Sequence, residues 1–185
     1  MSRIGSFKSR VVSRELMVCT FLKTPHYVMI EVFAQSGFDF LCLDAEHAPF
    51  ARRAIDECKA VSRALDFPVL VRVGDTSHRE ILSAIDCGAV GIVAPHIETL
   101  SQAEELAKAA RFGLGGRGYA GSTRWAGYAT KKMPDLLAQS QDETVVIAQI
   151  EEPAAVEIAD SIARIEGIDG LFAGPADLSV GRGYK

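Results

Sequence analysis

Polar side chains follow several of the short apolar segments in this 185-residue chain, at the points where those segments end. Asp44 and His47 follow one segment, and Glu151 and Asp177 come after two others. Carboxylate oxygens are the ligands that Mg²⁺ and Mn²⁺ prefer. Glu151 and Asp177 could therefore hold a divalent cation, with waters and substrate completing an octahedron.

A histidine and an arginine at these ends could handle protons and negative charge. Asp44, three residues before His47, could orient the imidazole and fix its tautomer, which makes a histidine a usable general base. Arg72 ends another apolar segment and could pair with a substrate carboxylate in a bidentate geometry. His96 is a second-tier candidate at a further segment end.

Each candidate also has a purely structural interpretation. Asp177 could be a helix N-cap, and Glu151 could be an acidic first-turn residue that complements a helix dipole. His47 could be a loop histidine, and Arg72 could belong to a structural salt bridge. The residues expected to be solvated surface groups are His26, His78 and Glu152.

Six apolar segments are predicted as strands. They are apolar at nearly every position, which is typical of strands covered on both faces in a parallel sheet. The predicted strands are 16–22, 38–43, 68–73, 91–95, 145–150 and 170–173.

Helical patterns fill the intervals between these strands. The stretch 101–104 matches a capping box that opens a helix, and Pro153 suits the first turn of a helix that continues through Ala163. The repeated β-α units, with function at the strand ends, predict a (β/α)8 barrel. A doubly wound open sheet is the alternative. No GxGxxG or Walker-type loop follows the first strand, and the glycine-rich stretch 113–118 is predicted as a loop that positions Arg117.

The composition excludes several classes of protein. The chain has 20 basic and 24 acidic residues and a net charge of −4, which argues against a nucleic-acid binder. Its apolar runs are far shorter than the roughly 20 residues of a membrane span, and no secretory signal is visible. Three of the four cysteines are predicted as buried thiols. A cytoplasmic protein that binds a small-molecule substrate is the default expectation.

Several motifs together resemble the class II metal-dependent pyruvate aldolases. The stretch 37–49, GFDFLCLDAEHAP, is similar to that family's GFDW-DGEHAP segment, with Ala45 where glycine is usual. The further matching motifs, in the expected order, are PVLVR (68–72), DCG (86–88), RG (117–118), QIE (149–151) and GPADLS (174–179). The resemblance implies a TIM barrel of the phosphoenolpyruvate/pyruvate type, a homo-oligomer (usually a hexamer), and a divalent metal (Mg²⁺, Mn²⁺ or Co²⁺) instead of a Schiff-base lysine.

The resemblance also implies roles for individual residues. His47 matches the catalytic base, supported by Asp44, and Arg72 matches the arginine that binds pyruvate and stabilises its enolate. Asp86 matches an aspartate that helps at the rim, across a subunit boundary. The remaining matches are Gln149 as a pyruvate contact, Glu151 and Asp177 as metal ligands, and the backbone at Ala176 and Asp177 as a clamp on the pyruvate carboxylate.

The function implied is reversible aldol cleavage of a 2-oxo-4-hydroxy acid to pyruvate and an aldehyde. The stretch 122–128 differs from the better-known members, so their aldehyde specificity does not transfer. Alternatives are a citrate-lyase-like or malyl-CoA-like carbon–carbon lyase, or an inactive barrel-derived binding protein. Because such a barrel needs about 250 residues, residues 1–185 are expected to form a single barrel domain that lacks its last two β-α units.

Overall fold

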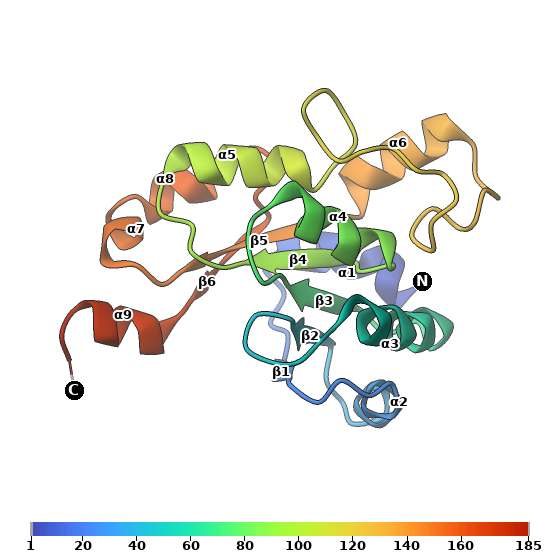
Figure 1. The fold of residues 1–185 in the computed structure, drawn as a ribbon, viewed down its shortest axis with the longest axis horizontal. Coiled ribbons are helices and arrows are strands. Elements are labelled where there is room, and N and C mark those ends of the chain that lie inside the picture. The colour runs from blue at the N-terminus through green and yellow to red at the C-terminus, as the bar shows by residue number, and fades with distance from the viewer. Residues whose placement is uncertain (1, 185) are drawn as a thin grey trace.

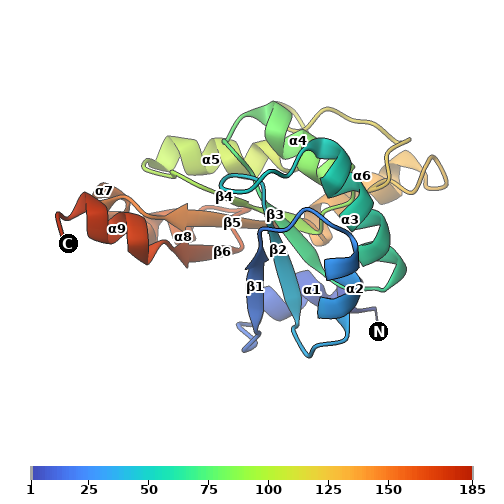
Figure 2. The ribbon, with the colours of Figure 1, turned by 60° about the horizontal axis from the view of Figure 1, so that its bottom comes forward.

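The computed structural model describes residues 2–184, which are built around a six-stranded parallel sheet (Figure 1). The strands are β1 (Cys19–Leu22), β2 (Phe40–Asp44), β3 (Val69–Arg72), β4 (Gly91–Ala94), β5 (Val145–Ile150) and β6 (Gly170–Ala173). They lie side by side in chain order. The strand direction turns steadily from β1 to β6, so the sheet is curled (Figure 2). All six predicted strands are confirmed. The doubly wound alternative is wrong, because such a sheet reverses its strand order partway and this one does not.

The described chain also forms helices, of which those between consecutive strands cover the outer face of the curl (Figure 1). They are α1 (Arg3–Val12), α2 (Val28–Ala34), α3 (Arg52–Ala64), α4 (His78–Asp86), α5 (Leu100–Ala109), α6 (Met133–Asp142), α7 (Pro153–Glu157), α8 (Ala159–Ala163) and α9 (Pro175–Gly181). Within residues 2–184, no helix has the length and apolar character needed to cross a membrane.

The two faces of the sheet pack against different partners. Outward-facing residues such as Leu43, Val71 and Ile92 join the larger core cluster with the helices between the strands. Inward-facing residues such as Cys42 and Leu70 form a second cluster around Phe7 of α1. Because successive side chains of a strand point to opposite faces, strands buried on both faces are apolar throughout. This explains the continuous apolar segments of the sequence.

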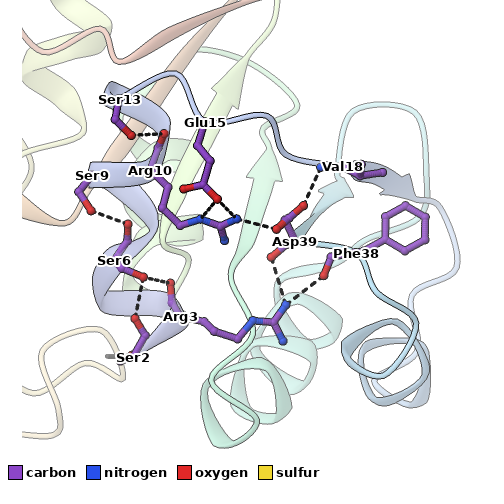
Figure 3. Close-up of polar contacts among 10 residues, drawn as sticks. All are labelled: Ser2, Arg3, Ser6, Ser9, Arg10, Ser13, Glu15, Val18, Phe38 and Asp39. Carbon is purple, nitrogen blue, oxygen red and sulfur yellow. Dashed lines mark hydrogen bonds and ion pairs between the residues drawn. The ribbon is translucent and has the colours of Figure 1, made fainter.

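Helix α1 lies across the amino-terminal ends of the strands and is held there by polar contacts. Figure 3 shows its link to the start of β2: Arg10 pairs with Asp39 at 2.7 Å, and Arg3 donates to the Phe38 carbonyl at 3.0 Å. On the other side of the sheet, Lys8 pairs with Asp169, just before β6, at 3.3 Å. The helix therefore ties the first strands of the curl to the last.

Two details of the predicted helices are wrong. The capping box of α5 uses Thr99 and Gln102, because the Thr99 hydroxyl accepts from the Gln102 N–H and the Gln102 side chain accepts from the Thr99 N–H. The helix predicted to run from Pro153 through Ala163 is divided into α7 and α8, since Ile158 lies outside the helical region (φ −114°, ψ 9°).

The glycine-rich stretch 113–118 is a loop, as predicted. The cysteine prediction is also confirmed: Cys42, Cys58 and Cys87 are buried free thiols, whereas Cys19 is exposed.

Candidate active site

The carboxyl ends of the strands bring charged side chains together on the concave side of the sheet. Asp44 ends β2 and lies in register with Arg72, which ends β3. Gln149 is the corresponding inward-facing residue of β5, and Glu151 follows that strand directly. These four residues were predicted to share this edge, and all four are buried.

Arg72 is held by two carboxylates and an aromatic ring. Its Nε and a terminal nitrogen contact the two oxygens of Asp44 at 3.0 and 2.8 Å, and its Nε lies 3.2 Å from Glu46 Oε2. The guanidinium carbon lies 4.8 Å from the centre of the Phe21 ring. A planar guanidinium fixed in this way keeps its orientation without further support.

Asp44 is ionised despite its burial. Desolvation acts to raise the pKa of this carboxyl, but the His47 backbone N–H (3.0 Å) and Arg72 outweigh it and hold the pKa below its usual value. The site therefore contains a fixed, buried ion pair at its centre.

A second group of three residues offers a ligand set for a metal ion. His96 Nε2 lies 3.3 Å from Glu46 Oε1, and His96 Nδ1 lies 3.2 Å from Glu151 Oε1. One ligand atom from each of the three residues lies within 4.8 Å of the others. Two carboxylates and an imidazole suit a divalent cation of the Mg²⁺, Mn²⁺ or Co²⁺ type.

His96 is held in an uncommon backbone conformation beside Glu151. Its φ of +55° lies in the left-handed region, which residues other than glycine seldom adopt. The same backbone donates its N–H to Glu151 Oε1 at 2.8 Å. Strain of this kind is concentrated at functional sites.

Gln149 and Gly174 shape the space around Glu151. Gln149 Nε2 donates to Glu151 Oε2, while its own Oε1 is buried without a hydrogen-bond partner in the described chain. A Cβ on Gly174 would lie 2.8 Å from Glu151 Cβ and 3.1 Å from its Oε2. Glycine is therefore required for β6 to approach this carboxylate. An orphaned oxygen beside clustered carboxylates fits a site that binds a cation or a polar substrate.

The predicted support of His47 by Asp44 takes a different form from the one expected. Asp44 accepts from the backbone N–H of His47 and gives its side-chain contacts to Arg72. The exposed His47 imidazole is nearest to Glu46, with Nε2 3.8 Å from Oε1. The strand register fixes Asp44 beside Arg72, whereas the turn after β2 carries the imidazole away from it.

Ala176 and Asp177 lie in the first turn of α9, directly after Gly174 and thus on the Glu151 side of the site. Both are exposed, and the Asp177 carboxylate is not one of the three clustered ligand residues. Its role as a metal ligand stays a prediction.

Asp86 lies apart from this group within the chain. It ends α4, on the side that leads into the amino-terminal end of β4, and it lines a separate cavity of about 450 Å³ with Arg52 and Arg124. Burial raises its pKa. Its predicted contribution across a subunit boundary is not tested by one chain.

Arg117 of the glycine-rich loop is also buried away from the site, over the rings of Phe112 (4.0 Å) and Trp125 (4.4 Å).

Sequence reasoning missed two residues of the site. Glu46 stands beside His47 in the motif but contacts both Arg72 and His96, and Lys23 reaches to 3.5 Å from Asp44 Oδ2. Lys23 follows β1 directly, so its position at a strand end was the available signal. His96, ranked below the others, proves central to the cluster.

The curled parallel sheet, with carboxylates, a histidine and an arginine at the carboxyl ends of its strands, defines an α/β enzyme with an acid-rich site. The HpcH/HpaI aldolase/citrate lyase family model matches residues 17–185. A 4-hydroxy-2-oxovalerate aldolase of Novosphingobium aromaticivorans is 33% identical over 184 residues, 97% of this chain and 68% of the relative. A 2-keto-3-deoxy-L-rhamnonate aldolase of Shigella sonnei is 34% identical over 184 residues, 96% and 67% of the two chains.

Among solved structures, a HpcH/HpaI aldolase/citrate lyase family protein from Burkholderia cenocepacia superposes with a TM-score of 0.89 at 31% identity, over 97% of this chain and 72% of that one. The chain belongs to the HpcH/HpaI aldolase/citrate lyase family. It is a carbon–carbon lyase.

Proposed function

We propose that the protein catalyses the reversible, divalent-metal-dependent aldol cleavage of a 2-oxo-4-hydroxy acid to pyruvate and an aldehyde. The observation that carries this proposal is the Glu46, His96 and Glu151 ligand set beside the fixed guanidinium of Arg72. A cation site next to an arginine suits a substrate with adjacent carboxylate and oxo groups.

The reaction breaks one carbon–carbon bond, and a proton transfer takes place before and after this step. A base removes the proton of the C4 hydroxyl, the C3–C4 bond breaks, and the oxygen becomes the carbonyl of the released aldehyde. The electron pair of the broken bond stays on C3 as an enolate, which takes up a proton to give pyruvate. His47 is the proposed base, because its exposed imidazole can reach a substrate and shed protons to solvent.

Glu151 would hold the metal with Glu46, His96 or Asp177 and with water. The metal would polarise the 2-oxo group and so lower the cost of forming the enolate. We place the pyruvate carboxylate against the backbone at Ala176 and Asp177.

Arg72 and Gln149 would bind the oxo-acid end of the substrate. Arg72 is oriented by Asp44 and Glu46, so its remaining N–H groups can meet developing negative charge without reorganisation. The buried Oε1 of Gln149 has no partner of its own and would accept a hydrogen bond from a coordinated water. Positioning of this kind is a large share of catalysis when charge develops on oxygen.

The second candidate is a citrate-lyase-like or malyl-CoA-like lyase, and the family's description names citrate lyase beside aldolase. Such an enzyme needs a basic cluster for the phosphates of coenzyme A, and the residues around the Glu151 site are mainly acidic. We also propose that the curled sheet belongs to a barrel of the pyruvate type that assembles as a homo-oligomer.

The test is a pyruvate-release assay over a panel of 2-oxo-4-hydroxy acids, with and without EDTA. We expect EDTA to abolish turnover, and Mg²⁺, Mn²⁺ or Co²⁺ to restore it. Borohydride should trap no pyruvate adduct on a lysine. Full turnover in metal-free protein, or a trapped lysine adduct, would overturn the metal-dependent mechanism. No turnover of any panel member in the presence of metal would favour the inactive binding protein.

A further inference from the structure

Lys23 stands at the same edge as the proposed catalytic residues, at the end of β1. Leu22 pairs with Leu43 at the last register position of β1, and Lys23 and Asp44 are the residues that follow these two in the chain. Lys23 and Phe21 are two residues apart and therefore face the same side. The Phe21 ring lies under Arg72, and Lys23 Nζ lies 3.5 Å from Asp44 Oδ2. The amine thus faces the site.

Asp44 does not need Lys23 for its own charge. Its Oδ1 accepts from Arg72 Nε and from the His47 backbone N–H, both at 3.0 Å, and a terminal nitrogen of Arg72 forms an ion pair with its Oδ2 at 2.8 Å. The Lys23 side chain is 62% exposed, whereas that of Arg72 is 10% exposed. An exposed lysine at 3.5 Å gains little from such a pair and keeps its freedom to contact a ligand.

The order of residues along the edge indicates which part of a substrate would meet Lys23. Along the carboxyl edge of the sheet, from β5 to β1, the order of these residues is Glu151, His96, Arg72, then Asp44 and His47, and finally Lys23. The proposed pyruvate groups lie at the Glu151 end and the proposed base follows β2. The aldehyde carbon then lies near β2, and its substituent extends toward β1. Neighbouring strands lie about 4.8 Å apart, so Lys23 is within reach of a short substituent.

We infer that Lys23 is a specificity-determining residue that binds an anionic group, a carboxylate or a phosphate, on the aldehyde part of the substrate. This inference rests on the proposed aldolase function. On the β2 side of the site Asp44 and Glu46 are carboxylates and Arg72 is paired with both, so an anionic substituent there needs a cation that is not already paired in this way. Lys23 supplies that cation next to the path of the substituent.

The experiment compares matched aldehyde pairs in the aldol direction, with pyruvate and Mg²⁺ or Mn²⁺. The pairs are 5-oxopentanoate with pentanal and glyceraldehyde 3-phosphate with glyceraldehyde. We expect the native protein to prefer the anionic member of at least one pair in kcat/KM, and Lys23→Met to reduce that preference about tenfold. Lys23→Arg should keep it. The carboxylate and phosphate pairs identify which anion is recognised.

Two further measurements separate substrate recognition from an effect on Asp44. Raising the ionic strength should weaken the preference in native protein and leave it unchanged in Lys23→Met. Lys108→Met, which removes an exposed lysine of α5, should behave as native. An equal fall for both members of each pair in Lys23→Met would overturn the inference, since Lys23 would then act through Asp44 and Arg72. A native protein without any preference for anionic aldehydes would also overturn it. No turnover of any aldehyde would instead reject the aldolase proposal on which it rests.

Discussion

The guanidinium of Arg72 is held in one orientation by its neighbours. Its fork meets the two oxygens of Asp44, its Nε also faces Glu46, and its flat surface rests on the Phe21 ring. Each contact depends on the planar shape of the guanidinium and not on its charge alone. The shape should therefore matter for catalysis as well.

Replacing Arg72 with lysine keeps the positive charge but removes the planar fork. We expect kcat/KM for cleavage to fall by at least about a hundredfold, comparable to losing one donor to a developing oxyanion. Steady-state kinetics with saturating metal measure the loss. Arg53→Lys is the matched control, because Arg53 makes only an exposed pair with Glu57 on α3. Near-native kinetics in Arg72→Lys would leave Arg72 as a structural ion-pair residue.

At the scale of single residues, the sequence predicts which residues lie at the carboxyl edge of the sheet better than it predicts which side chains contact one another. Asp44, Arg72, Gln149 and Glu151 were placed correctly because they end strands, and a parallel sheet collects such residues at one edge. The expected contact between Asp44 and the His47 ring is wrong because the chain turns between these two residues, and spacing alone does not fix a side chain's direction.

Glu46 was missed for the same reason, since its two partners, Arg72 and His96, belong to other strands.

Among the elements, α3 carries a lysine that pairs with no carboxylate of residues 2–184. Lys59 is 0% exposed, and its amine donates to the Val69 carbonyl at 2.8 Å and to the Ser62 hydroxyl at 3.1 Å. Burial lowers the pKa of Lys59 well below its usual 10.5, and the nearby Arg63 adds to this effect. The two donated bonds match the two N–H groups of a neutral amine, and through them the helix packs on β3.

Replacing Lys59 with methionine should stabilise the protein at neutral pH. The lowered pKa means that the unfolded chain holds the Lys59 proton up to a higher pH than the folded chain does, so the native protein gains stability as the pH rises. The stability advantage of Lys59→Met should therefore shrink between pH 7 and pH 10, by up to about 1.4 kcal/mol per pH unit. Denaturant titrations at several pH values measure it.

Lys108→Met, at an exposed position of α5, should show no such pH dependence. If the difference between Lys59→Met and native protein were constant with pH, the folded chain would carry a charged Lys59.

The elements themselves were predicted where periodicity is strong. The six strands are continuous apolar segments, and α3 and α5 have clear apolar faces. Helix α1 was not predicted, although Ile4, Phe7 and Val11 have the spacing of one helical face and pack in the same cluster. Its helical state depends on tertiary contacts: Asp66 accepts from the Arg3 and Ile4 N–H groups at the start of the helix.

On the scale of the whole molecule, the curled sheet carries the proposed catalytic residues at the carboxyl ends of its strands, its catalytic edge, and is closed by a helix at the amino-terminal ends. Helix α1 closes that end by inserting Phe7 among the inward-facing side chains of β2 to β5. Its polar contacts reach Asp39 near the start of β2 and Asp169 near the start of β6. By covering the amino-terminal ends, α1 holds the strands in the arrangement that brings their carboxyl ends together.

Replacing Phe7 with alanine tests whether the closed end stabilises the fold without taking part in the chemistry. Removing a fully buried phenylalanine should lower the free energy of unfolding by about 3–5 kcal/mol. Val12→Ala is the matched control on α1, since Val12 is exposed and its truncation should change stability by less than about 0.5 kcal/mol. Because Phe7 packs in the inward-facing cluster, away from the carboxyl ends that carry the proposed catalytic residues, the folded fraction of Phe7→Ala should keep a native KM and kcat at low temperature. Denaturant unfolding gives the free energy of unfolding, and kinetics corrected for the folded fraction give KM and kcat.

A native stability would show that α1 is dispensable for the curl. A large loss of kcat in fully folded Phe7→Ala would show that the closed end and the catalytic edge are coupled through the strands.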